Sequence, residues 1–577
     1  MIKKLFFIIF ITLLFYSRFV GLTWGLPYPM HPDERNMAVV VQQLKCETFE
    51  LKECLNPNFF AYGQLPLYTS FVLIKAFRLL LLQPFSSPVT FEEATISLRF
   101  ISAFSSILTV LILYKIIENI LVNKEELNFL SRAIVFLSLS FTPFSIQIAH
   151  FGTTESLLIA IYSGLIYFSL RIIDNDKVFR NAFFIGCLLG VSAGIKISSV
   201  VFAVVPVLVI LYIVKQRKKI NIFTRLKTLV MLLFILAISA TCGYVTSSPH
   251  NLISGAEFLR TLDYESAIAL GKIPVFYTRQ FFLASPYFFQ LANIFPYAFG
   301  SPLYFIFIAG FFLLPLKNAK LAILRIAFIV PFLIFGATYA KWSRFMAPVF
   351  PIVSVIAVLG MIKYHYVIVE KFKKMGYWLS LLITVILIIP GLAYISIYSN
   401  EDVRFVASGW INENLPDDKI LLSETANVVD IPLVSEPVTK NFRVVSFDFY
   451  NVDTEAALKN ELIYYLNSAQ YILVPSRRVF ANQTCFWPEK RADYSFLIKS
   501  VAYDSTRCSK LLSKYPILHY YYSNLFDETR YEKIAEFTSY PKISLFGKKF
   551  IEFPDEDAEE TWTVFDHPVI RIYKKII

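Results

Sequence analysis

The sequence is short of charged residues. Asp, Glu, Lys and Arg make up only 17% of its 577 residues, whereas soluble domains usually carry about a quarter. Hydrophobic residues make up 56%, and they gather in blocks long enough to cross a bilayer as a helix, which takes about 20 residues. The composition excludes an ordinary soluble globular protein and predicts a polytopic α-helical membrane protein.

Other features that the sequence lacks exclude further kinds of protein. The N-terminal stretch has no clear small-x-small cleavage site, and its apolar run exceeds the roughly 7–15 residues of a signal-peptide core, so we interpret it as a retained first span. Neither an internal repeat nor a low-complexity linker is evident. The net charge of +12 lies mostly in short loops between apolar blocks, as topology determinants do. Nucleic acid is therefore not an expected partner.

Eleven apolar blocks are predicted to span the membrane. Their ranges are 5–24, 98–120, 130–148, 154–172, 181–196, 198–214, 228–247, 301–316, 322–340, 346–362 and 377–397. A further block, 64–84, contains Lys75 and Arg78, which are costly at mid-bilayer. We expect this block to lie on the membrane surface as an amphipathic helix.

Loop charge sets the predicted topology. With the N-terminus in the cytoplasm and 64–84 excluded, the strongest basic runs fall on the cytoplasmic side, as the positive-inside rule requires. These runs include Lys124 and the stretch KQRKKINIFTRLK. The transmembrane domain then covers residues 1–398, with a first outer loop at 25–97 and a long outer loop at 248–300. The predicted location is a cell membrane, with the bacterial inner membrane favoured.

Residues 399–577 differ in kind from the rest. They are polar, with strand-like runs (KILLSE, RVVSFDFY, QYILVPS, VIRIYKK) and a helical run, EAALKNELIYYLNSA. Alternating strands and helices predict an α/β domain, and an odd number of spans places it outside the cytoplasm. The four cysteines of the predicted outer side form two local pairs, Cys46 with Cys54 and Cys485 with Cys508. Disulfides are expected in an oxidising compartment, with free thiols as the alternative.

The predicted topology brings scattered polar residues to one membrane face. They are His31, Asp33 and Glu34 in the first outer loop, Arg99 at the outer end of span two, His150 and Glu155 between spans three and four, Lys196 between spans five and six, Arg279 in the long outer loop, and Tyr339, Lys341 and Arg344 between spans nine and ten. Each alone has a structural explanation, such as a solvated carboxylate, a helix cap or a lysine that snorkels to the interface. Because all of these residues are predicted to lie on the same face of the membrane, a shared function is favoured.

The chemistry of these side chains suggests what that function is. A carboxylate can serve as general base towards a hydroxyl, and Arg and Lys bind phosphate, Arg through two parallel hydrogen bonds. A phosphate held at a membrane surface points to a lipid phosphate. We therefore expect transfer from a lipid-phosphate donor to a hydroxyl, with Arg99, Lys196 and Arg344 around one pocket within reach of Asp33 and with Arg279 as a further phosphate ligand. The remaining members of the group are expected to bind the acceptor or to support the site: His31, His150, Glu155, Tyr339 and Lys341.

Several motifs together resemble a known family. HPDE, SLRFISAFSSILTVLILYKI, FTPFSIQIAHFGTTESLL, AGIKISSV, FYTRQF and RFMAPVFP occur in this order, and the whole set resembles the membrane glycosyltransferases of the GT-C fold. The branch it is similar to includes protein O-mannosyltransferases and aminoarabinose transferases, of the glycosyltransferase family 39 type. The tail, with FTSYPKI and DEDAEETWTVFDHPVIRIYKK, resembles the outer domain of bacterial members.

The resemblance implies roles for individual residues. It implies a polyprenyl-phosphate-linked sugar as donor, an acceptor lipid, glycan or protein, and an inverting displacement at the anomeric carbon. The acidic pair of the first outer loop supplies the catalytic base, with Asp33 favoured and Glu34 as its orienting partner, and Arg99 contacts the donor phosphate. Two departures stand out: Glu155 replaces an Asp that is common in the family, and Phe345 replaces the Tyr that often follows the arginine of its RY motif.

Alternatives of other classes stay open at this point. A secondary transporter or lipid flippase would place its site near the bilayer midplane, often within repeats, whereas here the ionisable residues cluster at one edge. A structural role, with the tail as a binding module, is a third interpretation. No cofactor is certain. A divalent metal bound by His31, His150 and carboxylates is conceivable, although their spacing is not a standard site.

Overall fold

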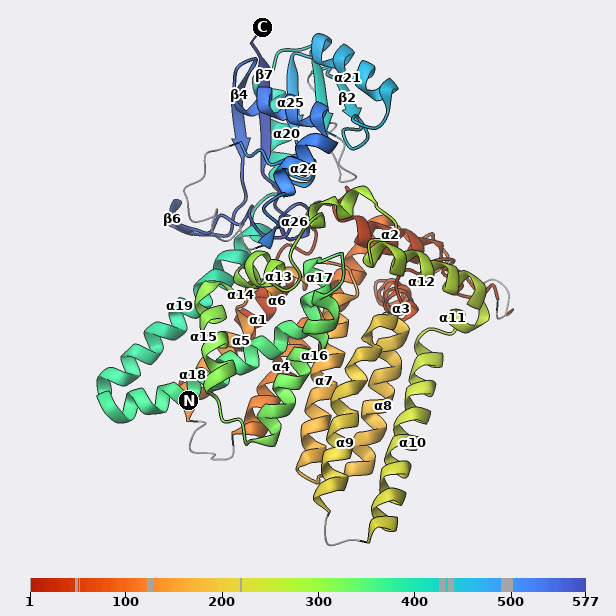
Figure 1. Ribbon diagram of the computed structural model, residues 1–577, viewed down its shortest axis with the longest axis vertical. Helices are drawn as coiled ribbons and strands as arrows, with labels where there is room; N and C mark the ends of the chain where they lie inside the picture. The colour runs from red at the N-terminus through yellow and green to blue at the C-terminus, as the bar shows by residue number, and fades with distance from the viewer. Residues whose placement is uncertain are drawn as a thin grey trace.

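The computed structural model describes residues 2–46, 50, 52–121, 128–217, 221–424, 431–433, 440–488 and 502–576. It consists of a helical bundle and an α/β domain stacked along the long axis (Figure 1). Lys124, Lys218 and Lys219, which belong to the basic runs of the predicted topology, lie outside the described residues.

The described part of the chain contains eight helices that are long and apolar enough to cross a membrane. They are α4 (Phe91–Ile120), α7 (Glu155–Ile173), α8 (Val178–Ile195), η2 with α9 (Ile197–Gln216), α10 (Ile222–Ser247), α16 (Ala319–Gly336), α17 to α18 (Ser343–Phe372) and α19 (Lys374–Ser399). A ninth is formed by α13 and α14 (Phe288–Phe299) with α15 (Ser301–Leu313) if this pair, bent by 117°, counts as one span. The prediction of a polytopic helical membrane protein is confirmed.

The remaining two of the eleven predicted spans are shorter helices. α1 (Ile2–Phe19) coincides with the first predicted block. The block 130–148 is divided into α5 (Phe129–Ser140) and α6 (Pro143–Gln147). Because Pro143 cannot donate a backbone hydrogen bond, the helix stops just before it and restarts. Over the described residues, the apolar parts of α1 and α5 are only 10–17 residues long, so the count is eight or nine rather than eleven.

The block 64–84 is not among the candidate spans. It forms α3 (Gln64–Leu80), and Arg78 on this helix is buried against Glu93 with an N–O distance of 2.6 Å. The other face of its C-terminal end is apolar and exposed, with Leu82 at 93% exposure. In Figure 1, α3 lies at the end of the bundle nearest the α/β domain, together with α2 (Pro32–Gln43), α11 (His250–Ile253) and α12 (Gly255–Ala269).

The C-terminal part is a mixed α/β domain, as predicted. Its five-stranded sheet has the order β2-β1-β3-β7-β4, in which β2, β1 and β3 are parallel and β7 is antiparallel to both β3 and β4. The strands are β1 (Ile420–Glu424), β2 (Arg443–Phe447), β3 (Tyr471–Val474), β4 (Tyr531–Phe537) and β7 (Ile570–Lys575). The helices are α20 (Val403–Asn414), α21 (Ala456–Ser468), α22 (Phe480–Gln483), α24 (Arg507–Lys514), α25 (Pro516–Phe526) and α26 (Glu560–Thr563).

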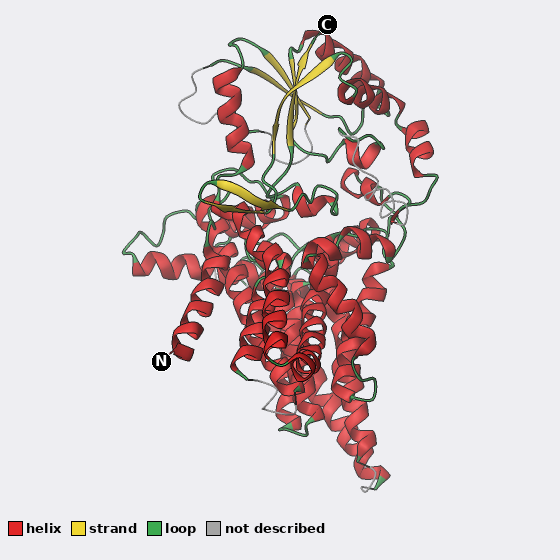
Figure 2. Ribbon diagram, turned by 90° about the vertical axis from the view of Figure 1, so that its left-hand side faces the viewer, coloured by secondary structure: helices red, strands yellow, loops and turns green. Residues whose placement is uncertain are grey.

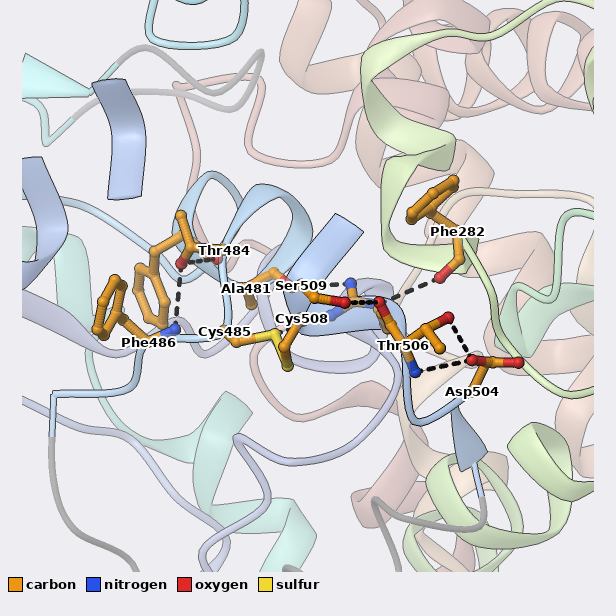
Figure 3. The surroundings of a disulfide bond; sticks show 11 residues. Phe282, Ala481, Thr484, Cys485, Phe486, Asp504, Thr506, Cys508 and Ser509 are labelled. Carbon is orange, nitrogen blue, oxygen red and sulfur yellow. Dashed lines mark hydrogen bonds between the residues drawn. A yellow bond between two sulfur atoms is a disulfide. The ribbon is translucent and has the colours of Figure 1, made fainter. Parts of the chain in front are cut away.

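A small hairpin and one disulfide complete the domain. The hairpin consists of β5 (Lys542–Leu545) and β6 (Lys548–Glu552), and Figure 2 shows it at the junction of the domain with the bundle. Cys485 and Cys508 form a disulfide that ties the segment after α22 to α24 (Figure 3). A second disulfide joins Cys46 to Cys54 in the loop after α2.

Residues 555–567, which we call the roof segment, dock the domain onto the bundle. Glu559 accepts hydrogen bonds from the backbone N–H of Ser343 (3.0 Å) and from the side chain of Gln280 (2.9 Å). The Gln147 amide donates to the carbonyl of Trp562 (2.7 Å). These bonds run to α17, η3 (Phe276–Phe281) and α6, so the roof segment is fixed to three separate parts of the bundle.

Candidate active site

Asp33 and Glu34 lie in the first turn of α2, where carboxylates are favoured by the helix dipole. His31 is the N-cap, and its Nδ1 accepts the backbone N–H of Glu34 at 3.4 Å. Its ring packs between Phe151 and Phe565, with centroids 4.7 and 4.4 Å away. Burial and the positive charge of nearby arginines lower the pKa of His31 well below its usual value, so the ring is neutral and suited to its role as a cap.

Glu34 is buried in a bidentate ion pair with Arg99. Arg99 Nε and Nη2 donate to the two carboxylate oxygens at 2.7 Å each, and the backbone N–H of Gly152 adds a third hydrogen bond of 2.7 Å. The side chains of the pair are only 1% and 3% exposed. Every oxygen of Glu34 is thus already engaged, and the pair ties α2 to α4 and to the loop before α7.

Arg99 therefore does not occupy the position expected for a phosphate ligand. Its Nη1 donates to the carbonyls of Leu22 (2.7 Å) and Trp24 (2.8 Å), and its guanidinium lies 4.3 Å from the ring centroid of Trp24. Arg99 lines neither of the two cavities described below. The expectation that Arg99, Lys196 and Arg344 surround one pocket is wrong for Arg99, because its hydrogen-bond donors point into the protein.

Asp33 lies in a different environment from its neighbour. Its carboxylate forms an ion pair with Arg344 of α17, and the two side chains keep 20% and 27% exposure. Both line a small cavity of about 40 Å³, together with His31, Gln147, Thr153 and Glu155. This volume has room for no more than a few water molecules.

The roof segment supplies the remaining wall of this small cavity. Thr561, Trp562 and Phe565 line it from the α/β domain. Glu560 of the same segment pairs with the buried Arg478 at 2.8 Å, and burial raises the pKa of Glu560. The site that contains Asp33 is therefore built jointly by the bundle and the C-terminal domain.

A larger, mostly apolar cavity of about 380 Å³ adjoins the small one. Its volume falls in the range of small-molecule and cofactor sites, about 300–1,000 Å³. Aromatic and aliphatic side chains dominate its wall, among them Phe60, Tyr62, Leu158, Phe258, Phe335, Trp342 and Phe345. Its charged residues are Glu155, Lys196, Glu265 and Arg344.

Two residues belong to both cavities, and they carry opposite charges. Glu155 and Arg344 line the large and the small cavity alike. Lys196 Nζ lies 3.5 Å from Glu155 and 5.2 Å above the ring centroid of Phe345. The structure thus brings together Asp33, Glu155, Lys196 and Arg344 from four segments of the chain.

Two other predicted site residues, Arg279 and Lys341, lie elsewhere. Arg279 donates to the carbonyl of Tyr450 at 2.6 Å, and so contacts the α/β domain rather than a cavity. Lys341 is buried and donates to the carbonyls of Thr338 and Tyr339 at 3.0 Å each, and burial lowers its pKa to about 8. The structure thus directs Nη1 of Arg279 at the α/β domain and places this residue in the wall of neither cavity.

His150 is a structural residue. Its two ring nitrogens lie 2.7 Å from the carbonyl of Ile146 and 2.8 Å from that of Val20, and its ring stacks on Tyr398 at 3.7 Å. The envisaged metal set of His31, His150 and carboxylates does not form, since the ring of each histidine is committed to other contacts. Among the described residues, no group of three or more His, Cys, Asp or Glu side chains is arranged to hold a metal.

Two further groups contribute to the site, Glu265 and the roof segment. Glu265 of α12 lines the large cavity. Burial raises its pKa, and Lys196 opposes the rise. In sequence, the roof segment stands out only by its resemblance to the outer domain of bacterial members. A signal for it was present in its acidic run followed by Trp562 and Phe565, an unusual mixture for a solvent-exposed loop.

Comparison with known proteins agrees with the resemblance found in the motifs. Residues 86–244 match the model of the family described as dolichyl-phosphate-mannose-protein mannosyltransferase. The match includes Arg99, Glu155 and Lys196, whereas Asp33 and Arg344 lie outside it. The resemblance to this family is thereby confirmed for that part of the chain. No curated protein matches the sequence.

Solved structures with a related arrangement include two enzymes. ArnT from Cupriavidus metallidurans in the apo state has a TM-score of 0.45 at 14% identity, over 82% of this chain and 93% of that one. The same protein bound to undecaprenyl phosphate gives 0.46 at 15%, over 81% and 92%. The Archaeoglobus fulgidus oligosaccharyltransferase in the apo form gives 0.46 at 12%, over 98% and 88%. All three TM-scores are below 0.5, and none of the three identities exceeds 15%.

Proposed function

We propose that this protein is a membrane glycosyltransferase that moves a sugar from a polyprenyl-phosphate donor to an acceptor hydroxyl. The observation that carries the proposal is the position of Arg344, which pairs with Asp33 and lines both the large apolar cavity and the small one. A phosphate ligand and a base that meet at one arginine suit a transfer reaction from a lipid phosphate. The match of residues 86–244 to a mannosyltransferase family supports the same reaction class.

The large cavity is suited to the donor. Its apolar wall accommodates the first isoprene units, while Lys196 and Arg344 offer the positive charge that a phosphate requires. When the phosphate binds, it competes with Asp33 for Arg344 and with Glu155 for Lys196. Donor binding therefore frees the Asp33 carboxylate, which is otherwise held in an ion pair and cannot readily accept a proton.

The proposed reaction is a single displacement. The acceptor oxygen attacks the anomeric carbon, Asp33 takes the hydroxyl proton, and the bond from the anomeric carbon to the phosphate oxygen breaks with inversion. Lys196 and Arg344 stabilise the charge on the departing lipid phosphate. Glu34 does not exchange protons in this scheme, because its three hydrogen bonds hold α2 in place so that Asp33 faces the small cavity.

We infer that the site faces away from the cytoplasm. The C-terminal end of α9 and the N-terminal end of α10 lie at the end of the bundle opposite the α/β domain (Figure 1), and Lys215, Arg217, Arg225 and Lys227 lie at or next to these helix ends. The positive-inside rule assigns such an end to the cytoplasm. A bacterial inner membrane fits this orientation, with the acceptor lipid, glycan or protein on the outer side.

Binding of a polyprenyl phosphate to the purified protein in lipid nanodiscs tests the proposal. Lys196→Ala and Arg344→Ala are expected to weaken binding at least tenfold. Arg260→Ala and Lys272→Ala are matched controls, because these exposed cations line neither cavity. Equal affinity in all four variants would refute the donor site. A transporter would instead bind its substrate near mid-bilayer, whereas the charged residues here come from span ends and connecting segments.

A further inference from the structure

The hairpin of β5 and β6 carries an apolar tip that nothing in the described structure covers. Phe546 is 97% exposed, Phe550 79% and Leu545 58%. All residues from Ser544 to Phe550 are exposed. Exposed apolar side chains are ordinary on the lipid-facing helices of the bundle, but three such large side chains within six residues of a polar domain mark an interaction surface.

The backbone at the tip makes the presence of phenylalanine more informative. Phe546 and Gly547 form the two-residue turn, and both have positive φ, 51° and 76°. Turns of this kind favour Asn, Asp or Gly at both positions, because a bulky side chain in the left-handed region is strained. A phenylalanine held there at a conformational cost, with its ring fully exposed, indicates a role outside the domain.

The hairpin lies beside the end of a helix that is long and apolar enough to span a membrane. β5 packs against α19, and the backbone N–H of Lys542 donates to Ser396 Oγ at 3.0 Å. Ser396 is in the last turn of this spanning helix, which ends at Ser399. Figure 1 shows the hairpin projecting sideways beyond the upper end of α19, and Figure 2 places it between the sheet and the bundle.

Charge also favours a lipid surface as the partner. Lys548 and Lys549 follow the turn directly and are exposed, with Lys549 also 2.7 Å from Glu552. Aromatic rings flanked by lysines are typical of segments that rest in the headgroup region, where the rings meet the acyl chains and the ammonium groups meet phosphates. A soluble protein as partner would not explain why the hairpin lies beside the end of a spanning helix.

We propose that the tip of this hairpin inserts into the outer-facing headgroup layer of the bilayer beside α19 and anchors the α/β domain to the membrane. The hairpin ends at Glu552, three residues before the roof segment. Its anchoring therefore limits how far the wall of the small cavity can move away from Asp33. The inference depends on the placement of the spans and not on the proposed sugar transfer.

Fluorescence quenching in nanodiscs tests this anchor in the full-length protein. A Cys187→Ala/Cys242→Ala background removes the two free thiols and keeps both disulfides. A nitrobenzoxadiazole label is attached at Ser544→Cys, and at Tyr464→Cys as the matched control on α21, which Figure 1 places far from the bundle. Nitroxide lipids in phosphatidylcholine discs should quench the label at 544 several-fold more than the label at 464, and aqueous iodide should do the reverse.

Two further variants sharpen the outcome. Phe546→Asn/Phe550→Ser suits the turn better, yet should expose the label at 544 to iodide as fully as the label at 464. Lys548→Glu/Lys549→Glu should reduce lipid quenching, and more so when the discs contain phosphatidylglycerol. Equal iodide quenching at 544 and 464 in the parent would overturn the proposal. Protection from iodide without quenching by lipid nitroxides would also overturn it, because it would show a protein partner or a second copy instead.

Discussion

Replacing Glu34 by Gln tests whether this carboxylate stabilises the fold, whereas the adjacent carboxylate of Asp33 belongs to the cavity. The Glu34–Arg99 pair has two charge-assisted hydrogen bonds of 2.7 Å and side chains that are 1% and 3% exposed. A glutamine keeps one acceptor oxygen but turns an NH₂ group towards an arginine that only donates. Arg99 is then left as a buried charge without a counter-charge, which typically costs about 3–5 kcal/mol of stability.

The matched comparison is Asp33→Asn. Its ion pair with Arg344 leaves 20% and 27% of the two side chains exposed, so solvent screens it and the expected loss is on the order of 1 kcal/mol. Thermal unfolding of both variants in one detergent, followed by the loss of the monodisperse peak in size-exclusion chromatography, measures the difference. Glu34→Gln should melt well below Asp33→Asn.

A double-mutant cycle isolates the interaction itself. Arg99→Gln alone should also destabilise strongly, because it leaves the buried Glu34 carboxylate with only the N–H of Gly152 as a donor and removes the arginine donor from the carbonyls of Leu22 and Trp24. The double variant should lose much less than the sum of the two single losses. If Glu34→Gln melts like Asp33→Asn, or if the two single effects simply add, the structural role assigned to Glu34 is refuted.

Four other outcomes are expected. Asp33→Asn should lower the rate of sugar transfer by about 10²–10⁴-fold in proteoliposomes while donor binding remains, and wild-type turnover would remove Asp33 from the mechanism. Arg344→Lys should bind polyprenyl phosphate more weakly than retained charge predicts, since lysine cannot form two parallel bonds; equal affinity to the parent would count against the clamp. Peptide mapping without reductant should recover the linked pairs Cys46–Cys54 and Cys485–Cys508, and four free thiols would reject both the pairing and the assigned side. Finally, burial lowers the pKa of His567, but the carboxylates of Asp566 and Asp555 outweigh this effect and raise the pKa to about 10. The protonated ring therefore contributes its full stabilisation below about pH 6.5, and this contribution disappears as the pH rises through about 10. Over that range, the unfolding temperature of the parent should fall more steeply than that of His567→Gln.

Local patterns were sufficient for much of the architecture. The apolar blocks predicted nearly every spanning helix, because lipid requires about 20 consecutive apolar residues whatever the partners are. The strand runs KILLSE, RVVSFDFY, QYILVPS and VIRIYKK appear as β1, β2, β3 and β7. The charges Lys75 and Arg78 correctly argued against a span at 64–84. In each case a property of a single segment decides its structure.

The sequence alone does not predict which partner each charged side chain contacts. Asp33 and Glu34 are adjacent, and side chains of successive helix residues point about 100° apart, so one faces the cavity and the other the core. Which is which depends on Arg99 and Gly152, which no local pattern connects to them. Arg279 likewise bonds to Tyr450, a residue of the other domain. Long-range pairing, rather than residue type, decides whether a charged side chain faces a cavity or is buried in an ion pair.

The joint construction of the small cavity has a consequence for how the protein is made. Asp33 is translated early, whereas Thr561, Trp562 and Phe565 follow every span. A nascent chain therefore carries its base through the whole of membrane insertion without the wall that shields it. On the proposed function, a half-built enzyme would expose an activated lipid-linked sugar to water and waste it by hydrolysis. The small cavity can therefore take its final shape only after the roof segment has been translated and has docked onto the bundle.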